Sequence, residues 1–243
     1  MNPRIILITG ANGTLGQALA RAFLDESSAN SVWLGVNRRR ETADALAAAN
    51  AARCQVLPLD VTAPTAWAEA VSRILAAHQR LDVLVNNAGT HDDAFLATMK
   101  PATWRDVLAV NLDGVFHGCQ AVLPTMITQR SGRIINISSL SALLAPAGQT
   151  NYAAAKAGVV ALTQSLAKEV ARIGITVNAL CPGYVDTDAL GHMNEDERKR
   201  ALEKIPMRRF GRPEEVAAAA RFLACAEAGY ITGSALKIDG GII

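Results

Sequence analysis

The sequence is poor in aromatic residues, cysteine and net charge, and each shortage argues against a class of protein. Phe, Trp and Tyr make up 5% of the 243 residues, and no basic stripe with interleaved aromatic residues is present. The chain therefore lacks the pattern of a nucleic-acid binder. Lys and Arg outnumber Asp and Glu by only 24 to 22. A net charge this small gives no argument for a polyanionic partner.

The four cysteines, at positions 54, 119, 181 and 225, form no C-x-x-C pair. Their spacing predicts neither a zinc site nor a disulfide framework, and we expect no metal and reduced, mostly buried thiols. No apolar run approaches the roughly 20 residues that span a bilayer. The apolar run near the N-terminus leads straight into glycine, unlike a signal peptide. We therefore expect a cytoplasmic protein with no membrane partner.

Apolar residues, by contrast, make up half of the chain, and short apolar runs alternate with helical patterns. The runs occupy residues 4–9, 32–36, 54–59, 82–86, 133–138 and 176–180. The helical patterns occupy residues 15–25, 43–51, 65–79, 101–128 and 152–173. Because the runs do not alternate with polar residues, they are typical of parallel strands buried on both faces. The sequence predicts one α/β domain over residues 1–243, a Rossmann-type doubly wound parallel sheet with helices on both faces.

Residues 186–207 break this rhythm with the charged stretch NEDERKR at 194–200. Two interpretations stay open, a solvated helix face or a mobile flap over a site, because ligands of such sheets bind beyond the carboxyl ends of the strands. We expect a substrate flap at about these residues.

The stretch TGANGTLG, residues 9–16, lies between the first predicted strand and the first predicted helix. Glycine permits a tight turn and a close approach of the backbone to phosphate, and a helix N-terminus attracts anions. The turn therefore predicts a phosphate cradle for a dinucleotide, although a tight turn without a ligand has the same pattern. The predicted cradle comprises Gly10, Asn12, Gly13, Thr14, Leu15 and Gly16.

The second predicted strand ends in GVNRRRE, which bears on the choice of dinucleotide. NAD sites usually place an acidic residue there, on the ribose 2′-hydroxyl. Here Asn37 stands near that position, and Arg38 and Arg39 follow it. A guanidinium matches the oxygens of a phosphate, so these residues favour NADP(H), with a solvated basic turn as the alternative.

The stretch NYAAAK places Tyr152 and Lys156 on one face of a predicted helix. An ammonium about 4 Å from the phenol would stabilise the tyrosinate by roughly 4 kcal/mol, which lowers its pKa by about three. Ser139 ends an apolar strand 13 residues earlier, where its hydroxyl could hold a carbonyl oxygen or simply cap a turn.

These motifs, with NNAG at 86–89, Asn111 in VNLDG and CPGYVDT at 181–187, resemble the short-chain dehydrogenase/reductase family over essentially the full length. The resemblance implies that Tyr152 is the general acid and that Lys156 lowers its pKa and binds the nicotinamide ribose. It also implies that Ser139 orients the carbonyl and that Asn111 holds a water of a proton relay.

The resemblance implies further cofactor contacts along the chain. Asp60 and Val61 would flank the adenine, and Asn87, Ala88 and Gly89 would border the cofactor. The carboxamide and phosphate end would be met by Pro182, Gly183, Val185 and Thr187.

The glycine turn departs from the family pattern T-G-x-x-x-G-x-G at Gly13 and Thr14. Thr14 could donate its hydroxyl to phosphate. The departure also removes a basic residue that often meets the 2′-phosphate, which leaves the NADP preference to Arg38 and Arg39.

Within the family the chain most resembles bacterial 3-oxoacyl-thioester reductases of fatty acid synthesis, which implies NADPH-dependent reduction of a thioester on acyl carrier protein or CoA. Gln149 would face the thioester, with Ala94, Phe95 and Leu144 as pocket walls. Arg130 and Arg172 would meet an acidic carrier protein, or are simply solvated. The family also implies a homotetramer.

Other functions stay open at this point. A dehydrogenase of a sugar, polyol or other secondary alcohol shares most of these motifs. A non-catalytic dinucleotide sensor is the remote alternative. Such proteins typically lose the tyrosine or the lysine, and this chain keeps both. Gly114 and Gly118 form G-x-x-x-G, which on this helix indicates close packing rather than membrane association.

Overall fold

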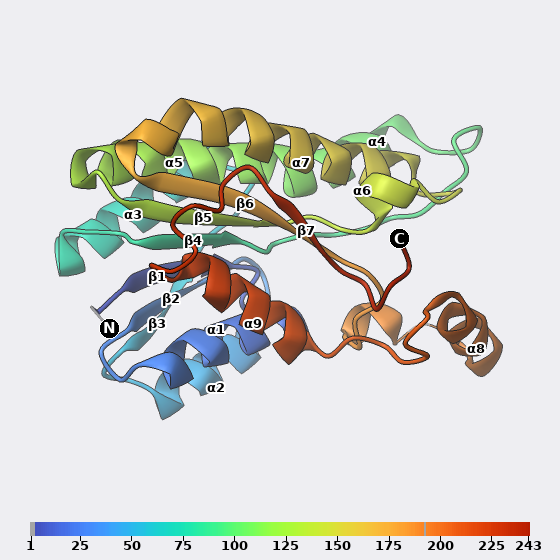
Figure 1. Cartoon of the computed structure of the whole chain (residues 1–243), viewed down its shortest axis with the longest axis horizontal. Coiled ribbons are helices and arrows are strands. Elements are labelled where there is room, and N and C mark those ends of the chain that lie inside the picture. The colour runs from blue at the N-terminus through green and yellow to red at the C-terminus, as the bar shows by residue number, and fades with distance from the viewer. Residues whose placement is uncertain (1–2, 192) are drawn as a thin grey trace.

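The computed structural model describes residues 3–191 and 193–243 of the chain (Figure 1). Seven parallel strands form one sheet in the order β3-β2-β1-β4-β5-β6-β7. The strands are β1 (Ile5–Thr9), β2 (Ser31–Val36), β3 (Cys54–Pro58), β4 (Val83–Asn86), β5 (Gly132–Ile137), β6 (Ile175–Pro182) and β7 (Ala235–Ile238). The predicted doubly wound parallel sheet is confirmed. The seventh strand escaped prediction because β7 is short and only partly buried.

Helices cover both faces of the sheet (Figure 1). The α-helices are α1 (Thr14–Glu26), α2 (Glu41–Ala49), α3 (Pro64–His78), α4 (Pro101–Leu108), α5 (Gly114–Gln129), α6 (Ser141–Leu144), α7 (Thr150–Val170), α8 (Glu195–Lys204) and α9 (Pro213–Ala224). Three short helical turns are η1 (Ala109–Asp113), η2 (Ala171–Ile173) and η3 (Asp188–Leu190). One apolar core joins α1, α2 and α9 to the sheet, and a second joins α3, α5 and α7 to its other face.

The strand order reverses between β1 and β4, and this reversal determines where a ligand-binding crevice forms. The chain leaves β3 at one edge and returns to pair β4 with β1 on the other side. Such a reversal opens a crevice at the carboxyl ends of the central strands. Every residue of β1 and β4 is buried, which explains why both are apolar up to the polar residue, Thr9 or Asn86, that ends each strand.

The predicted helix at residues 101–128 is interrupted by η1, a single π-turn at Ala109–Asp113. Such turns are frequent at functional sites, and the apolar periodicity gave no sign of this one. Directly after it, Gly114 and Gly118 face inward. A Cβ on Gly114 would lie 2.9 Å from Val61, and one on Gly118 would lie 2.5 Å from the Asn86 side chain. The two glycines thus serve close packing inside the chain.

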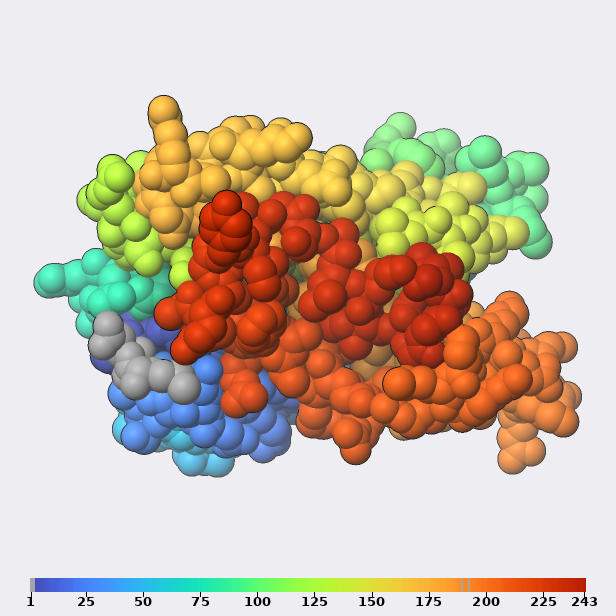
Figure 2. Space-filling view, in the orientation of Figure 1, coloured from blue at the N-terminus to red at the C-terminus, as the bar shows by residue number. Residues whose placement is uncertain are grey.

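Residues 186–207 contain η3 and α8 and lie at the end of the molecule where the strands finish (Figure 1). Figure 2 shows this segment as a lobe that projects from the body. Ala201 is the buried residue of α8, so the solvated helix face that the charged sequence suggested is present. His192, within the expected flap, lies outside the described residues.

In the described part of the chain, no helix is both long enough and apolar enough to cross a bilayer. The cysteines are free, and Cys54, Cys119 and Cys181 are buried, as the sequence predicted for them.

Candidate active site

Four residues of the predicted catalytic set come together at the carboxyl ends of β4 and β5. Ser139 follows β5, Asn111 lies in the π-turn η1, and Tyr152 and Lys156 lie in the first turns of α7. Asn111 and Lys156 are buried, while Ser139 and Tyr152 are half-buried. Each side chain is therefore held by a different element around one crevice.

Lys156 is anchored below this crevice. Its Nζ donates a 2.9 Å hydrogen bond to the backbone carbonyl of Ile137, the last residue of β5. Burial lowers the pKa of Lys156 from 10.5 to about 8, and the nearby Cys181 thiol opposes that shift. Desolvation disfavours a charged ammonium, so the pKa of this lysine is brought close to neutral pH.

Tyr152 differs from the sequence-based prediction. The Lys156 Nζ lies 5.7 Å from the centroid of the Tyr152 ring. Burial raises the pKa of Tyr152, the Ser139 hydroxyl lowers it, and the Asp93 carboxylate raises it further. The predicted lowering by Lys156 is therefore wrong for this structure, because the ammonium is directed to Ile137 and desolvation favours the neutral phenol.

The π-turn orients the Asn111 amide. Its Nδ2 donates to the carbonyls of Thr90 (2.7 Å) and Val107 (2.8 Å). Its Oδ1 is buried and, among the described residues, has no hydrogen-bond partner. A Cβ on Gly89 would lie 2.9 Å from this oxygen, so any larger residue at position 89 would crowd the acceptor. A buried acceptor without a protein partner is a place for a ligand or water hydroxyl.

The glycine turn needs two of its three glycines. Gly10 has a φ of +63°, and a Cβ there would lie 2.8 Å from the Ala88 Cα. A Cβ on Gly16 would lie 2.4 Å from the Gly10 carbonyl oxygen. Gly13 has an ordinary φ of −78°, and a Cβ there would meet nothing nearer than 3.7 Å. The departure from the family pattern at Gly13 therefore falls where the backbone tolerates any residue.

The NNAG segment holds this turn in place. Asn87 Nδ2 donates to the Thr9 carbonyl at 2.9 Å. The Thr9 hydroxyl in turn accepts from the backbone N–H groups of Asn87 and Ala88, both at 2.9 Å. These bonds join the ends of β1 and β4, the two strands beside the crevice, and give the segment a supporting part in the cradle.

Asn12 and Thr14 each have partners that the sequence did not predict. The Asn12 Oδ1 accepts from the backbone N–H groups of Thr42 (3.0 Å) and Ala43 (3.2 Å) at the start of α2. The Thr14 hydroxyl donates to Asp188 Oδ2 at 2.7 Å. Asn12 thus links the glycine turn to the start of α2, which follows the arginine turn after β2. Direct contact of either side chain with a cofactor stays a prediction, as it does for the half-buried Leu15.

The end of β2 presents exposed cations. Asn37, Arg38 and Arg39 are exposed, whereas Arg40 pairs with Asp44 at 2.6 Å. Across from them, hydrogen bonds from Thr62 hold the pKa of Asp60 below its usual value, with smaller contributions from Asn37 and Arg38.

This arrangement fits a phosphorylated dinucleotide. Cβ atoms on Gly10 and Gly16 would collide with backbone atoms, so glycine keeps this turn tight beside the N-terminus of α1, where phosphate groups bind. Among the described residues, Arg39 has no ion pair or hydrogen bond, and Arg38 has none beyond its charge interaction with Asp60. Two guanidinium groups are therefore available to a 2′-phosphate.

The remaining predicted cofactor residues lie along the crevice. Val61 is buried against Gly114. Pro182 ends β6, and Gly183 packs against Asp239. Val185 is buried and forms a bridge with Gly211. Thr187 is half-buried and precedes η3.

The substrate side contains a residue that sequence reasoning missed. Gln149 Oε1 accepts from the Ser141 hydroxyl at 2.9 Å, and its Nε2 donates to Asp93 at 2.8 Å. Asp93 follows NNAG by four positions and comes directly after Asp92, and nothing in the local sequence marks it as the partner of Gln149. Phe95 and Leu144 are 71% and 48% exposed, and Ala94 donates its N–H to the Gly148 carbonyl nearby.

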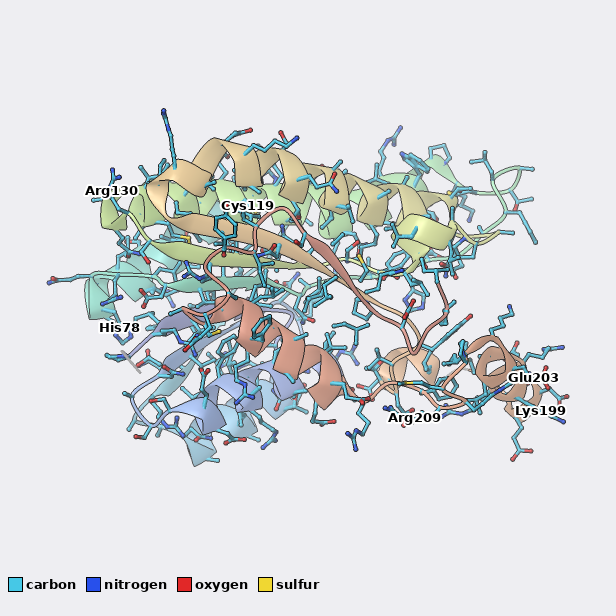
Figure 3. The ribbon with its side chains drawn as sticks, in the orientation of Figure 1. His78, Cys119, Arg130, Lys199, Glu203 and Arg209 are labelled. Atoms are coloured by element: carbon cyan, nitrogen blue, oxygen red, sulfur yellow. The ribbon has the colours of Figure 1, made fainter. Side chains whose placement is uncertain are left out.

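Arg130 and Arg172 are not near this crevice. Arg130 ends α5, and Arg172 lies in η2 after α7. A Cβ on Gly174, just after η2, would lie 2.7 Å from the Arg130 carbonyl oxygen, so the two elements meet. Figure 3 shows Arg130 at the end of the molecule opposite Lys199 and Glu203 of α8. At 1.5 Å per residue, α7 separates Arg172 from Tyr152 by about 30 Å.

Known proteins share this sequence over nearly its whole length. A family model described as enoyl-(acyl carrier protein) reductase matches residues 10–243. The 3-oxoacyl-(acyl-carrier-protein) reductase FabG of Thermotoga maritima is 42% identical over 242 residues, covering 99% of this chain and 98% of the relative. Nodulation protein G of Azospirillum brasilense is 41% identical over 253 residues, covering 100% and 99%. FabG of Escherichia coli is 38% identical over 239 residues, covering 98% and 97%.

The matched region contains the glycine turn, the NNAG segment and the Ser139, Tyr152 and Lys156 constellation described above. Identity near 40% over almost all of both chains exceeds what a shared fold alone gives. The chain therefore belongs to the short-chain dehydrogenase/reductase family of oxidoreductases.

Proposed function

We propose that the protein is an NADPH-dependent reductase of 3-oxoacyl thioesters, forming 3-hydroxyacyl thioesters in the cytoplasm. The observation that carries the proposal is the neutral, half-buried Tyr152 phenol between the Ser139 hydroxyl and the buried Lys156. The relatives named 3-oxoacyl-(acyl-carrier-protein) reductase, which share this chain's full extent, support the thioester substrate.

Tyr152 is suited to protonate a carbonyl oxygen. Because burial raises its pKa, the phenol keeps its proton at neutral pH, which is the state a general acid needs. The Ser139 hydroxyl, beside it, donates to the same oxygen and orients the carbonyl. When bound, the dihydronicotinamide supplies the hydride. Alcohol oxidation would use the same group as its base, in the phenolate form, so the raised pKa of Tyr152 means that oxidation would require a more alkaline pH than reduction.

Lys156 and Asn111 lie behind the phenol. The Lys156 ammonium, with its pKa lowered to about 8, gains and loses a proton within the range where enzymes work. It has one hydrogen bond to Ile137, which leaves N–H groups for a ribose hydroxyl. The free Asn111 Oδ1 offers an acceptor for a water of a proton relay. Together they would return a proton to Tyr152 after each turnover.

The cofactor preference rests on Arg38 and Arg39. A monoanionic or dianionic 2′-phosphate pairs with a guanidinium through charge-assisted hydrogen bonds. NADH lacks that phosphate and would leave the arginines unpaired.

On the substrate side, Gln149 offers a hydrogen-bond donor for the thioester, and exposed apolar residues offer a surface for the acyl chain. The Gln149 amide is held by Ser141 and Asp93, and its Nε2 carries a second N–H that can reach a thioester oxygen. Phe95 and Leu144 offer apolar surface for an acyl chain. Residues 186–207 form the proposed flap on the other side of the crevice.

A carrier protein that docks on Arg130 and Arg172 of one subunit would have to deliver its acyl group to the crevice of another subunit. Arg130 and Arg172 present two exposed cations to an acidic surface, but they lie about 30 Å along α7 from Tyr152 of the same chain. We therefore propose that a carrier docked there serves the crevice of another copy, in the homotetramer that the family resemblance implies.

The first test is oxidation of NADPH in the presence of acetoacetyl-CoA, with NADH in parallel. Rapid oxidation of NADPH and slow oxidation of NADH supports both the thioester and the arginine assignment. If NADPH binds tightly but is not oxidised, the same assay with an acetoacetyl carrier protein separates the two carriers. Failure with both substrates, together with reduction of NADP+ by a secondary alcohol, would replace the proposal with an alcohol dehydrogenase.

A further inference from the structure

A hydrogen bond that the proposed reaction does not use joins two segments far apart in the sequence. The Thr14 hydroxyl donates to Asp188 Oδ2 at 2.7 Å, and the Asp188 N–H lies 3.5 Å from the same hydroxyl oxygen. Thr14 is the first residue of α1, directly after the glycine turn. Asp188 opens η3, next to Thr187. The bond therefore connects the phosphate side of the crevice with the proposed flap.

The two ends of the flap are anchored elsewhere. The Asp186 N–H donates to the Gly211 carbonyl at 2.9 Å, and the Met207 N–H donates to the Gly240 carbonyl at 3.2 Å. Between these anchors, α8 is strongly charged, and Ala201 is its buried residue. A helix with so little buried apolar surface gains little from packing against the body. Arg198 of α8 pairs with Asp186 at 3.3 Å and lies 4.9 Å from the Phe210 ring centroid. The bond to Thr14 ties η3, at the start of the segment and two residues after Asp186, to the glycine turn.

The position of this bond matters for ligand exchange. The dinucleotide phosphates of the proposed function would lie on the Gly10–Gly16 turn, at the N-terminus of α1. A segment tied to Thr14 lies beside the N-terminus of α1, where that turn ends. The Thr14 hydroxyl is also committed to Asp188 and is not free for a phosphate oxygen. The residue that departs from the family pattern has therefore acquired a partner in the flap.

We propose that Thr14 and Asp188 form a clasp that holds η3, at the start of the proposed flap, against the glycine turn and slows the exchange of the dinucleotide. The clasp rests on the proposed dinucleotide site for its effect on exchange, but not for its effect on the flap itself. Thr14 and Asp188 are positioning residues in this proposal, and neither takes part in the chemical step.

The first test uses the protein without cofactor. Trypsin cleaves after lysine and arginine, and α8 carries Arg198, Lys199, Arg200 and Lys204. If the clasp holds the segment, T14V and D188A should increase the rate of cleavage within α8 by about fivefold, the scale expected for losing one hydrogen bond to a charged group at an exposed site. T14S keeps the hydroxyl and should match the wild type. Asp25 is exposed on the same helix as Thr14, so D25N controls for the loss of one negative charge.

The second test measures release of NADPH by displacement with excess NADP+ in stopped-flow fluorescence. T14V and D188A should each release NADPH about fivefold faster, and the double variant should be no faster than either single variant, because the two changes break one bond. Thermal melting checks that each variant folds as the wild type does.

The outcomes separate the clasp from the proposed function. Cleavage rates that do not change in T14V and D188A would overturn the clasp, whatever the cofactor does. Slower release in D188A with no change in T14V would also overturn it, since the carboxylate would then merely repel phosphate. Faster cleavage in a protein that fails to bind NADPH would leave the clasp in place and refute the proposed function.

Discussion

The two ends of the crevice use positive charge in opposite ways. At the catalytic end, Lys156 is 3% exposed, and burial lowers its pKa to about 8. At the other end, Arg38 and Arg39 are exposed after β2. The buried cation is held by the Ile137 carbonyl, whereas Arg39 has no such partner among the described residues.

The difference shows that burial, more than residue type, sets what a charged side chain does. Desolvation lowers the pKa of a buried ammonium and so makes its proton easier to remove, which suits a lysine that takes part in proton transfer. An exposed guanidinium keeps its charge at all working pH values, and this suits recognition of a phosphate. Substitutions at each end should therefore change different observables.

The largest effect is expected for Y152F at the buried end. Loss of the acidic proton should reduce kcat by about a thousandfold, while the affinity for NADPH changes little. Steady-state kinetics and fluorescence titration of NADPH measure the two quantities. Tyr230 is fully exposed, so Y230F is a matched control that should keep wild-type kcat. A Y152F variant with more than a tenth of wild-type kcat would show that another group is the acid.

A second substitution, K156M, tests how much the burial of a protonated Lys156 reduces the free energy of unfolding. The unfolded chain protonates this lysine below pH 10.5, but the folded chain does so only below about 8. The resulting penalty, roughly 3 kcal/mol, is complete below pH 8 and disappears as the pH rises from 8 to 10.5. K156M removes it but leaves the Ile137 carbonyl without its donor, so we expect a net stabilisation of about 2 kcal/mol at pH 7.5.

Urea unfolding at pH 7.5 and pH 10, at one protein concentration, measures this effect. The advantage of K156M over the wild type should shrink at the higher pH. Lys168 is exposed on the same helix, so K168M should show no such pH dependence. Equal stabilities of K156M and the wild type at both pH values would mean that the folded chain buries no protonation cost at this position.

At the exposed end, replacing Arg38 and Arg39 by serine should affect cofactor choice. We expect the KM for NADPH to rise about tenfold, because two charge-assisted hydrogen bonds to the 2′-phosphate are lost at a solvated site. The KM for NADH should hardly change. Arg40 pairs with Asp44, so R40S is the control that removes one neighbouring positive charge, and it is compared with the single variants R38S and R39S. A parallel rise in both KM values would remove the 2′-phosphate assignment.

The smallest effect is expected for N12A, which loosens the exposed end without removing a charge. The variant loses the acceptor that caps α2 at Thr42 and Ala43, at a cost of about 1 kcal/mol in stability. Because the arginine turn precedes α2, the KM for NADPH should rise by about twofold, roughly the factor for half of that energy. Asn50 caps the other end of α2, so N50A should lower the thermal midpoint but leave this KM unchanged.

Much of this molecule was predictable from local patterns. Six of the strands and the helices between them followed from apolar runs and helical periodicity, because parallel strands buried on both faces lack polar alternation. Ser139, Tyr152 and Lys156 followed from their spacing and from the family resemblance. The π-turn at Asn111 could not be found in this way, since its helical pattern continues through the turn.

The contacts made between distant segments were not predictable. Nothing near Gln149 in the sequence indicates Asp93, and nothing near Thr14 indicates Asp188, since these pairs lie 56 and 174 residues apart. The pKa of Tyr152 was predicted in the wrong direction, because helical spacing brings Lys156 near but does not reveal that burial of the phenol raises its pKa.

The sequence by itself therefore determined the order of strands and helices, the glycine turn and the types of reacting groups, because these depend on the backbone preferences and side-chain chemistry of neighbouring residues. Only the tertiary structure decided which hydroxyl is free, which ammonium is desolvated and which turn is tied to the flap. Those properties depend on burial and on partners that chain folding brings together, and neither quantity is local in the sequence.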